Sequence, residues 1–217
     1  MKMFKVLAIT SVIALGVTAA RADLLVAWEF AGISGVTAGS ITSTVAHADM
    51  AATSDMEISR GSGLTPSSNT GGYAANNWSQ AGLDLDDYFE FNVKAGVGFV
   101  FDVDTVVCNL RRSGTGPVNF ELRSSLDGYA SALDSFTASA NGLYTNSLSS
   151  ISGQSDVTFR LYGSGAGAAT GSMNLGGASN DLIINGSVSV VPEPTTLAGL
   201  SLGFLAVYGF RRRKVRS

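Results

Sequence analysis

Apolar and polar residues alternate with a period of two in several short runs in the middle of the chain. In the segment DYFEFNV, Phe89, Phe91 and Val93 fall on one side of an extended chain. Such alternation is typical of a β-strand that buries one face and exposes the other to water, so the pattern predicts half-buried antiparallel strands. The other runs of this kind are Leu24, Val26, Trp28 and Phe30; Val118, Phe120 and Leu122; and Val157, Phe159 and Leu161.

Further strands are predicted where short apolar runs are separated by Gly, Asn and Ser turns. They cover residues 41–46, 55–59, 97–103, 105–111, 129–137, 143–149 and 181–191, and no ten-residue amphipathic helix pattern is present. About ten short strands in one domain predict an all-β fold, a single antiparallel two-sheet sandwich of jelly-roll-like type. The long polar stretch from Arg60 to Asp87 is expected to be an excursion at one end of that sandwich.

The N-terminal segment has the three parts of a secretory signal peptide. Lys2 and Lys5 precede a predominantly apolar run of twelve residues, 6–17, and Ala20 and Ala22 are the small residues that signal cleavage requires. The sequence therefore predicts a signal helix in residues 1–22, recognition by the secretion machinery, and removal after Ala22 by signal peptidase. Residues 23–191 would then be the exported domain.

The C-terminal segment, residues 192–217, also has three parts. Pro192, Glu193 and Pro194 come first, followed by residues 195–210, which carry no charge. A helix of that length covers about 24 Å, so it is a short transmembrane helix. The basic end at 211–217 would stay on the cytoplasmic side and so place the preceding domain outside. Its first four residues are Arg211, Arg212, Arg213 and Lys214.

This tail resembles the PEP-CTERM sorting signal of Gram-negative bacteria that make exopolysaccharide. Pro192, Glu193 and Pro194 match its tripeptide, and the apolar run and basic end follow in the same order. The resemblance implies that an exosortase recognises and trims the tail in the membrane. The expected route is export, a transient stay in the inner membrane through the tail, and then the cell surface or the extracellular space.

Charge is divided sharply between the ends and the middle of the chain. Between Asp23 and Val191 there are six basic and sixteen acidic residues, a net charge of −10. Such a domain repels the phosphates of nucleic acids, which excludes them as expected partners. The single cysteine, Cys108, lies in an apolar run and is predicted to be a small buried hydrophobic residue.

Two groups of residues are candidate binding sites. Asp84, Asp86 and Asp87 concentrate oxygen ligands of the kind that Ca²⁺ prefers, which suggests a structural calcium as the one candidate cofactor. A solvated acidic edge is the other interpretation. Tyr73 and Trp78 are aromatics in a polar stretch, where exposed rings could stack on a sugar. The alternative is that they cap the end of the sandwich.

No catalytic residues are predicted in the exported domain. We therefore expect a non-enzymatic protein of the cell surface or extracellular matrix, sorted through its tail. The first alternative is a carbohydrate-binding module with an extracellular polysaccharide as partner. The second is a secreted polysaccharide-acting enzyme that uses two carboxylates, for which a cleft containing such a pair would be evidence.

Overall fold

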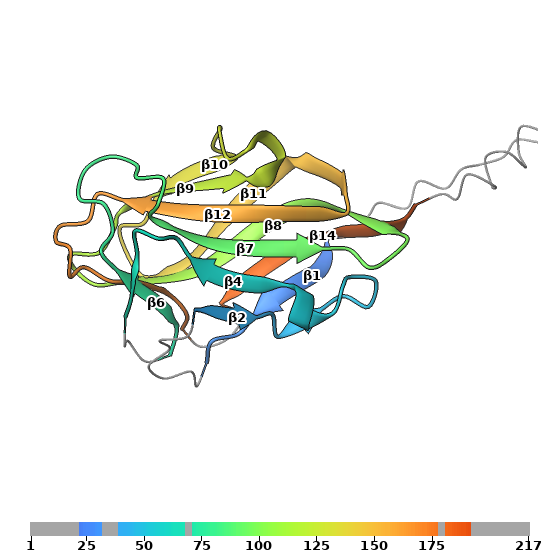
Figure 1. Cartoon of the computed structure of the whole chain (residues 1–217), viewed down its shortest axis with the longest axis horizontal. Coiled ribbons are helices and arrows are strands. Elements are labelled where there is room, and N and C mark those ends of the chain that lie inside the picture. Colours follow the sequence, from blue (N-terminus) through green and yellow to red (C-terminus); the bar gives the residue numbers. More distant parts are fainter. Residues whose placement is uncertain (1–21, 32–38, 68–70, 178–180, 192–217) are drawn as a thin grey trace, which may run out of the picture.

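The computed structural model describes residues 22–31, 39–67, 71–177 and 181–191 (Figure 1). The predicted signal helix, apart from Ala22, and the whole tail from Pro192 lie outside the described residues. The elements are β1 (Asp23–Trp28), β2 (Ser40–Thr42), β3 (Val45–Ala46), η1 (Thr53–Asp55), β4 (Glu57–Arg60), β5 (Thr65–Pro66), β6 (Tyr73–Asn76), β7 (Tyr88–Lys94), β8 (Phe99–Arg112), β9 (Asn119–Ser124), η2 (Ser125–Asp127), β10 (Asp134–Thr137), β11 (Gly142–Gln154), β12 (Asp156–Ser164), β13 (Met173–Leu175) and β14 (Leu182–Val190).

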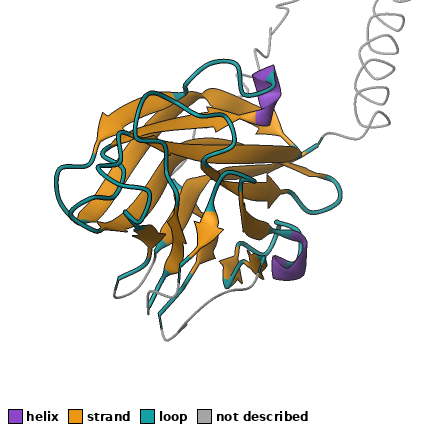
Figure 2. Ribbon diagram, turned by 60° about the vertical axis from the view of Figure 1, so that its left-hand side comes forward, coloured by secondary structure: helices purple, strands orange, loops and turns teal. Residues whose placement is uncertain are grey.

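The strands form two antiparallel sheets, as the alternating pattern predicts. An eight-stranded sheet contains β1, β3, β5, β6, β8, β11, β13 and β14, and a six-stranded sheet has the order β10-β9-β12-β7-β4-β2. Figure 2 shows the strands as two layers, with the short helices η1 and η2 as single turns at the surface. Within the described residues the protein is therefore all-β.

Eight of the strands are paired in a nested order. β9 pairs with β10, β8 with β11, β7 with β12 and β6 with β13, and successive pairs belong to alternate sheets. This gives the strand orders β6-β13-β8-β11 and β7-β12-β9-β10, which is the arrangement of a jelly roll. The remaining strands extend the two sheets: β14, β1, β3 and β5 in the larger, β4 and β2 in the smaller.

The core lies between the sheets and is dominated by aromatic rings. Phe89, Phe91 and Val93 on β7 are fully buried, and the predicted inward positions of β12 and of β9 from Phe120 onward are buried too. Trp28 of the larger sheet lies 6.0 Å from Phe91 of the smaller, centroid to centroid. Such contacts between layers bury most of the apolar surface that stabilises the fold.

In the first predicted strand the inward face is confirmed at Val26, Trp28 and Phe30, which are fully buried, but it is wrong at Leu24. Leu24 is 37 % exposed, whereas its neighbour Leu25 is fully buried. The pairing of β1 with β14 shifts register between Leu24 and Val26, which is the mark of a β-bulge. An extra residue in one strand reverses the facing of the residues before it, so the bulge turns Leu24 outward.

Other boundaries also differ from the sequence pattern. Residues 99–103 and 105–111 belong to one long strand, β8, whereas Val97 and Gly98 lie in the turn before it. Residues 41–46 divide between β2 and β3, which lie in different sheets. β13 was not predicted, although Met173 and Leu175 are fully buried. The stretch from Arg60 to Asp87 is not an excursion, because it supplies β5 and β6 to the larger sheet.

Substitution of Phe91 by alanine tests the contact between the sheets. The ring is fully buried, lies 6.0 Å from Trp28 of the other sheet and stacks on Phe159 of its own sheet at a centroid distance of 5.5 Å. Its removal leaves a cavity that the sheets cannot close, so Phe91→Ala should lower the free energy of unfolding by about 3–5 kcal/mol. The matched control is Leu143→Ala, at a side chain that is 65 % exposed, with an expected change below about 0.5 kcal/mol. Equal losses in urea denaturation would contradict this account of the core.

Candidate functional site

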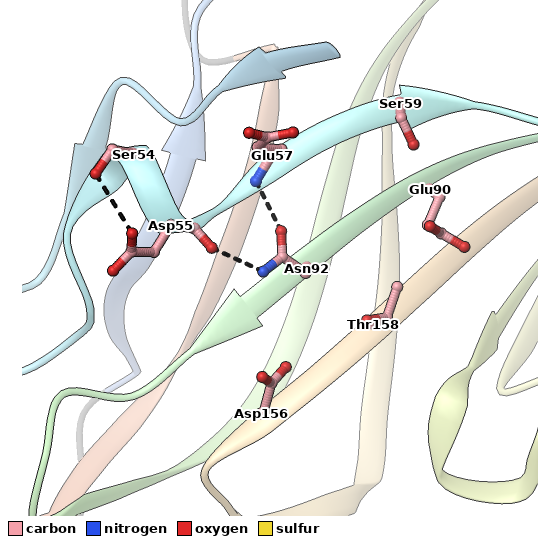
Figure 3. A pocket seen from close by; sticks show the side chains of 8 residues that line it. All are labelled: Ser54, Asp55, Glu57, Ser59, Glu90, Asn92, Asp156 and Thr158. Atoms are coloured by element: carbon pink, nitrogen blue, oxygen red, sulfur yellow. Dashed lines mark hydrogen bonds between the residues drawn. The ribbon is translucent and has the colours of Figure 1, made fainter. Parts of the chain in front are cut away.

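A polar groove lies on the outer face of the six-stranded sheet. It has a volume of about 400 Å³ and is lined from η1, β4, β7 and β12 (Figure 3). These side chains alternate with the buried residues of the same strands, so the register that fills the core also assembles the groove. The lining residues are Ser54, Asp55, Glu57, Ser59, Glu90, Asn92, Asp156 and Thr158.

Asn92 holds one wall of the groove together. Its side-chain oxygen accepts a hydrogen bond from the Glu57 amide at 2.7 Å, and its side-chain nitrogen donates to the Asp55 carbonyl at 2.9 Å. Both bonds are visible in Figure 3, where Asn92 lies between η1 and β4 on one side and β12 on the other. This one amide therefore fixes the short helix η1 against the sheet.

Hydrogen-bond acceptors dominate the groove. Its lining includes four carboxylates, and one of them, Glu90, is paired with Arg160 at 2.7 Å. Three hydroxyl groups and the Asn92 amide complete the lining. A surface of this kind suits a ligand rich in hydroxyl or amine donors and repels an anionic one.

Arg160 lies beside the groove between two tyrosine rings. Its guanidinium carbon is 4.1 Å from the centroid of Tyr88 and 3.9 Å from that of Tyr129. Tyr129 adopts a left-handed backbone conformation, with φ of 63°, directly after Gly128. Such a conformation costs energy for a bulky residue, and here it places the ring over Arg160. The two tyrosine rings therefore hold Arg160 in place, and the charge of Arg160 neutralises that of Glu90.

Tyr73 and Trp78, the predicted sugar-stacking residues, are buried. Tyr73 is fully buried, and Trp78 is 1 % exposed. The Tyr73 hydroxyl donates to the Gly39 carbonyl at 2.9 Å, and burial raises the pKa of Tyr73 to about 12 despite Arg60 over its ring. Neither ring has a free face, so the hypothesis of sugar stacking at these residues is wrong.

Trp78 is part of the core because a glycine makes room for it. A Cβ at Gly163 would come within 2.7 Å of the Trp78 ring. The ring packs edge-on against Phe89, and its N–H donates to the Ala75 carbonyl. Tyr73 and Trp78 are therefore both core residues that pack against Phe89.

The predicted calcium ligands do not converge. Asp84 and Asp86 are exposed, whereas Asp87 turns inward and is 4 % exposed. Burial raises the pKa of Asp87, although the Ser79 amide donates to its carboxylate. In the described ranges no group of three or more His, Cys, Asp or Glu side chains could hold a metal ion. The calcium hypothesis at these three residues is therefore not supported by their arrangement.

A pair of acidic residues that the sequence did not indicate lies near β1 and β14. Asp181 is fully buried, and its carboxylate accepts a hydrogen bond from the Phe30 amide at 2.7 Å. Burial raises the pKa of Asp181, and the neighbouring Glu29 carboxylate raises it further. No sequence signal marks this pair, because the two residues are far apart in the chain. Neither residue lines the groove.

The chain leaves the sandwich at the end of β14. Val190 pairs with Phe99, and the Val191 amide donates to the Gly98 carbonyl at 2.9 Å. Residues 190–214 match the family model of the PEP-CTERM protein-sorting motif. The tail carries a PEP-CTERM sorting motif. No curated protein and no solved structure matches the chain.

The PEP-CTERM motif begins where the hydrogen-bonded part of the sandwich ends. Its match starts at Val190, the last residue of β14, and Pro192, Glu193 and Pro194 follow the final backbone bond. The motif marks the chain as an exported protein with a membrane-associated tail that an exosortase processes. Among the described residues, no helix is long and apolar enough to span a bilayer.

Replacement of Asp181 by asparagine tests the buried carboxyl group. The pKa of Asp181 is higher in the folded protein than the ordinary value of 3.8. The protonated carboxyl group therefore stabilises the fold most below pH 3.8, and this stabilisation is lost as the pH rises through the raised pKa. Asp181→Asn removes this loss, so its melting temperature relative to the wild type should increase between pH 3 and pH 7. The control is Asp104→Asn at an exposed position of β8. Parallel melting curves for wild type and Asp181→Asn at every pH would contradict the assignment.

Proposed function

We propose that this is a non-enzymatic β-sandwich protein that acts at the cell surface or in the extracellular matrix after an exosortase has trimmed its tail. A signal peptide in residues 1–22 directs it to the secretion machinery. Until the tail is cut, the uncharged run at 195–210 holds it in the inner membrane, with the basic residues that follow on the cytoplasmic side.

One observation carries the proposal: the sorting motif adjoins a complete folded domain. β14 pairs with β8 from Leu182 to Val190, so a cut at Pro192–Pro194 removes no residue from a strand. The two prolines lack backbone N–H groups and cannot donate hydrogen bonds to a neighbouring strand, which favours recognition of the tripeptide by an enzyme. Trimming would therefore release the sandwich intact.

The arrangement of acidic residues supports a non-enzymatic role. Glu90, in the groove, is paired with Arg160, and Arg160 is in turn held by two tyrosine rings. Asp181 is buried next to the start of β14, outside the groove, and is held there by the Phe30 amide and the Asn109 side chain. A two-carboxylate mechanism needs a proton donor facing the substrate, and neither of these two groups is placed for that task. The other carboxylates of the groove, Asp55, Glu57 and Asp156, are exposed to solvent.

Glycan binding in the groove is the second candidate function. The groove lies on a sheet face and offers carboxylate, hydroxyl and amide groups to a hydroxyl-rich chain. Because the domain carries a net charge of −10, a neutral or amine-bearing polysaccharide suits it better than an acidic one. This assigns the sugar-binding alternative to a different surface from Tyr73 and Trp78.

Replacement of Pro192, Glu193 and Pro194 by alanine in the native host tests the sorting proposal. The variant should keep its full length and stay with the inner membrane, because the enzyme no longer recognises the tripeptide. Immunoblots of membrane and culture fractions measure both effects. The matched control replaces Thr195 and Thr196 by alanine and should be trimmed like the wild type. Normal trimming and release of the tripeptide variant would refute the proposal.

Filling the groove tests the glycan proposal. Ser59→Trp places a ring in the hollow and should reduce binding of the processed protein to the host exopolysaccharide at least about tenfold. Ser135→Trp, at an exposed position of β10 in the same sheet, is the control and should bind like the wild type. Affinity electrophoresis in gels with and without the polysaccharide measures the change. Equal retardation of both variants and the wild type would exclude the groove as the site.

A further inference from the structure

Both flanking segments of the exported domain leave from the same end of the sandwich. β1 and β14 are antiparallel, with Asp23 opposite Gly186, so the chain before Asp23 points toward the end at which β14 finishes. In Figure 1 the loop between β7 and β8 lies at this end, next to the last residues of β14. The apolar segments at 6–17 and 195–210 are therefore connected to one end of the domain.

The connection to the tail is short. Val191 is held by its hydrogen bond to Gly98, and the uncharged run begins at Thr195. Four residue steps of fully extended chain reach at most about 14 Å. While the run lies in the bilayer, this end of the sandwich cannot move further than that from the membrane surface.

Exposed apolar side chains gather at this end. Val97, at the tip of the loop between β7 and β8, is 102 % exposed, and Val190 and Val191 are 66 % and 43 % exposed. The pairing of Val190 with Phe99 and the bond from Val191 to Gly98 place all three valines in one small region. We call this region the exit end. Single exposed apolar residues are common, but a group beside a membrane-associated tail has an occupant within reach.

We propose that the exit end rests on the lipid surface of the membrane until the tail is cut, with Val97, Val190 and Val191 in contact with the lipid. The proposal rests on the membrane attachment of the tail described above. The contact positions Pro192–Pro194 at the depth of the bilayer surface, where a membrane-embedded enzyme can reach them. Apolar side chains at the boundary of headgroups and acyl chains are stabilised by removal from water.

A fluorescent probe at position 97 tests this contact in the full chain. The native Cys108 is fully buried, and burial raises the pKa of its thiol to about 12, so a dye labels Val97→Cys selectively. The labelled full-length protein is reconstituted into phosphatidylcholine vesicles whose acyl chains carry nitroxide quenchers. Zwitterionic lipid avoids repulsion of the acidic domain. The matched control is Leu85→Cys, at a residue that is 60 % exposed. Leu85 lies just before the start of β7, whereas the exit end lies just after the end of that strand.

Quenching at position 97 should exceed quenching at position 85 at least about threefold, because only the exit end lies at the lipid boundary. If the chain floats with the vesicles but the two positions are quenched equally, the contact is refuted while the membrane attachment stands. If the chain does not float, both proposals fail.

In the native host, Val97→Asp should slow trimming at least about twofold relative to Leu85→Asp. Equal trimming rates would also overturn the proposal, and both sites are too exposed for the substitutions to impair folding.

Discussion

The hydrogen bonding of β8 on both of its sides is the constraint on which most of the structure depends. Cys108 pairs with Tyr144 of β11 on one side and with Leu182 of β14 on the other. β13 continues the second side, opposite Leu110. This strand therefore joins the nested jelly-roll strands to β14 and β1, which carry the two flanking segments. A long central strand with a neighbour along each edge also pairs most of its backbone groups, although the pairing shifts register near Asp104 on both sides.

The same pairing connects the fold to sorting. Because β14 is held by β8 up to Val190, the domain ends as a rigid body next to the sorting tripeptide. The stability of the domain requires β14 to stay hydrogen-bonded to β8. The two prolines that follow lack the N–H groups that would continue this pairing into the sorting tripeptide. The hydrogen-bonded sandwich consequently ends within one or two residues of the sorting tripeptide.

Chemistry is divided between the two faces of the six-stranded sheet. On the inner face, aromatic rings from both sheets meet, and a buried polar group such as the Trp78 N–H is stabilised by a hydrogen bond within the core. On the outer face, residues of the same strands line the groove and hold Arg160 against the Tyr88 ring. Because neighbouring residues of a pleated strand face opposite sides, the same strands can supply both the core and the lining of the groove.

The sequence alone determined the class of fold, the acidity of the domain and the sorting motif, because alternation, net charge and a tripeptide before an apolar run are local properties of the chain. It also indicated the inward faces of β7 and β12, where no bulge intervenes. The bulge at Leu24, the burial of Tyr73 and Trp78 and the inward turn of Asp87 were decided by tertiary structure. Each depends on a distant partner: β14 for Leu24, Gly163 for Trp78, and Gly63 and Gly163 beside Asp87. The groove and the exit end likewise exist only after the sheets have paired, since strand register decides which side chains from separate segments become neighbours.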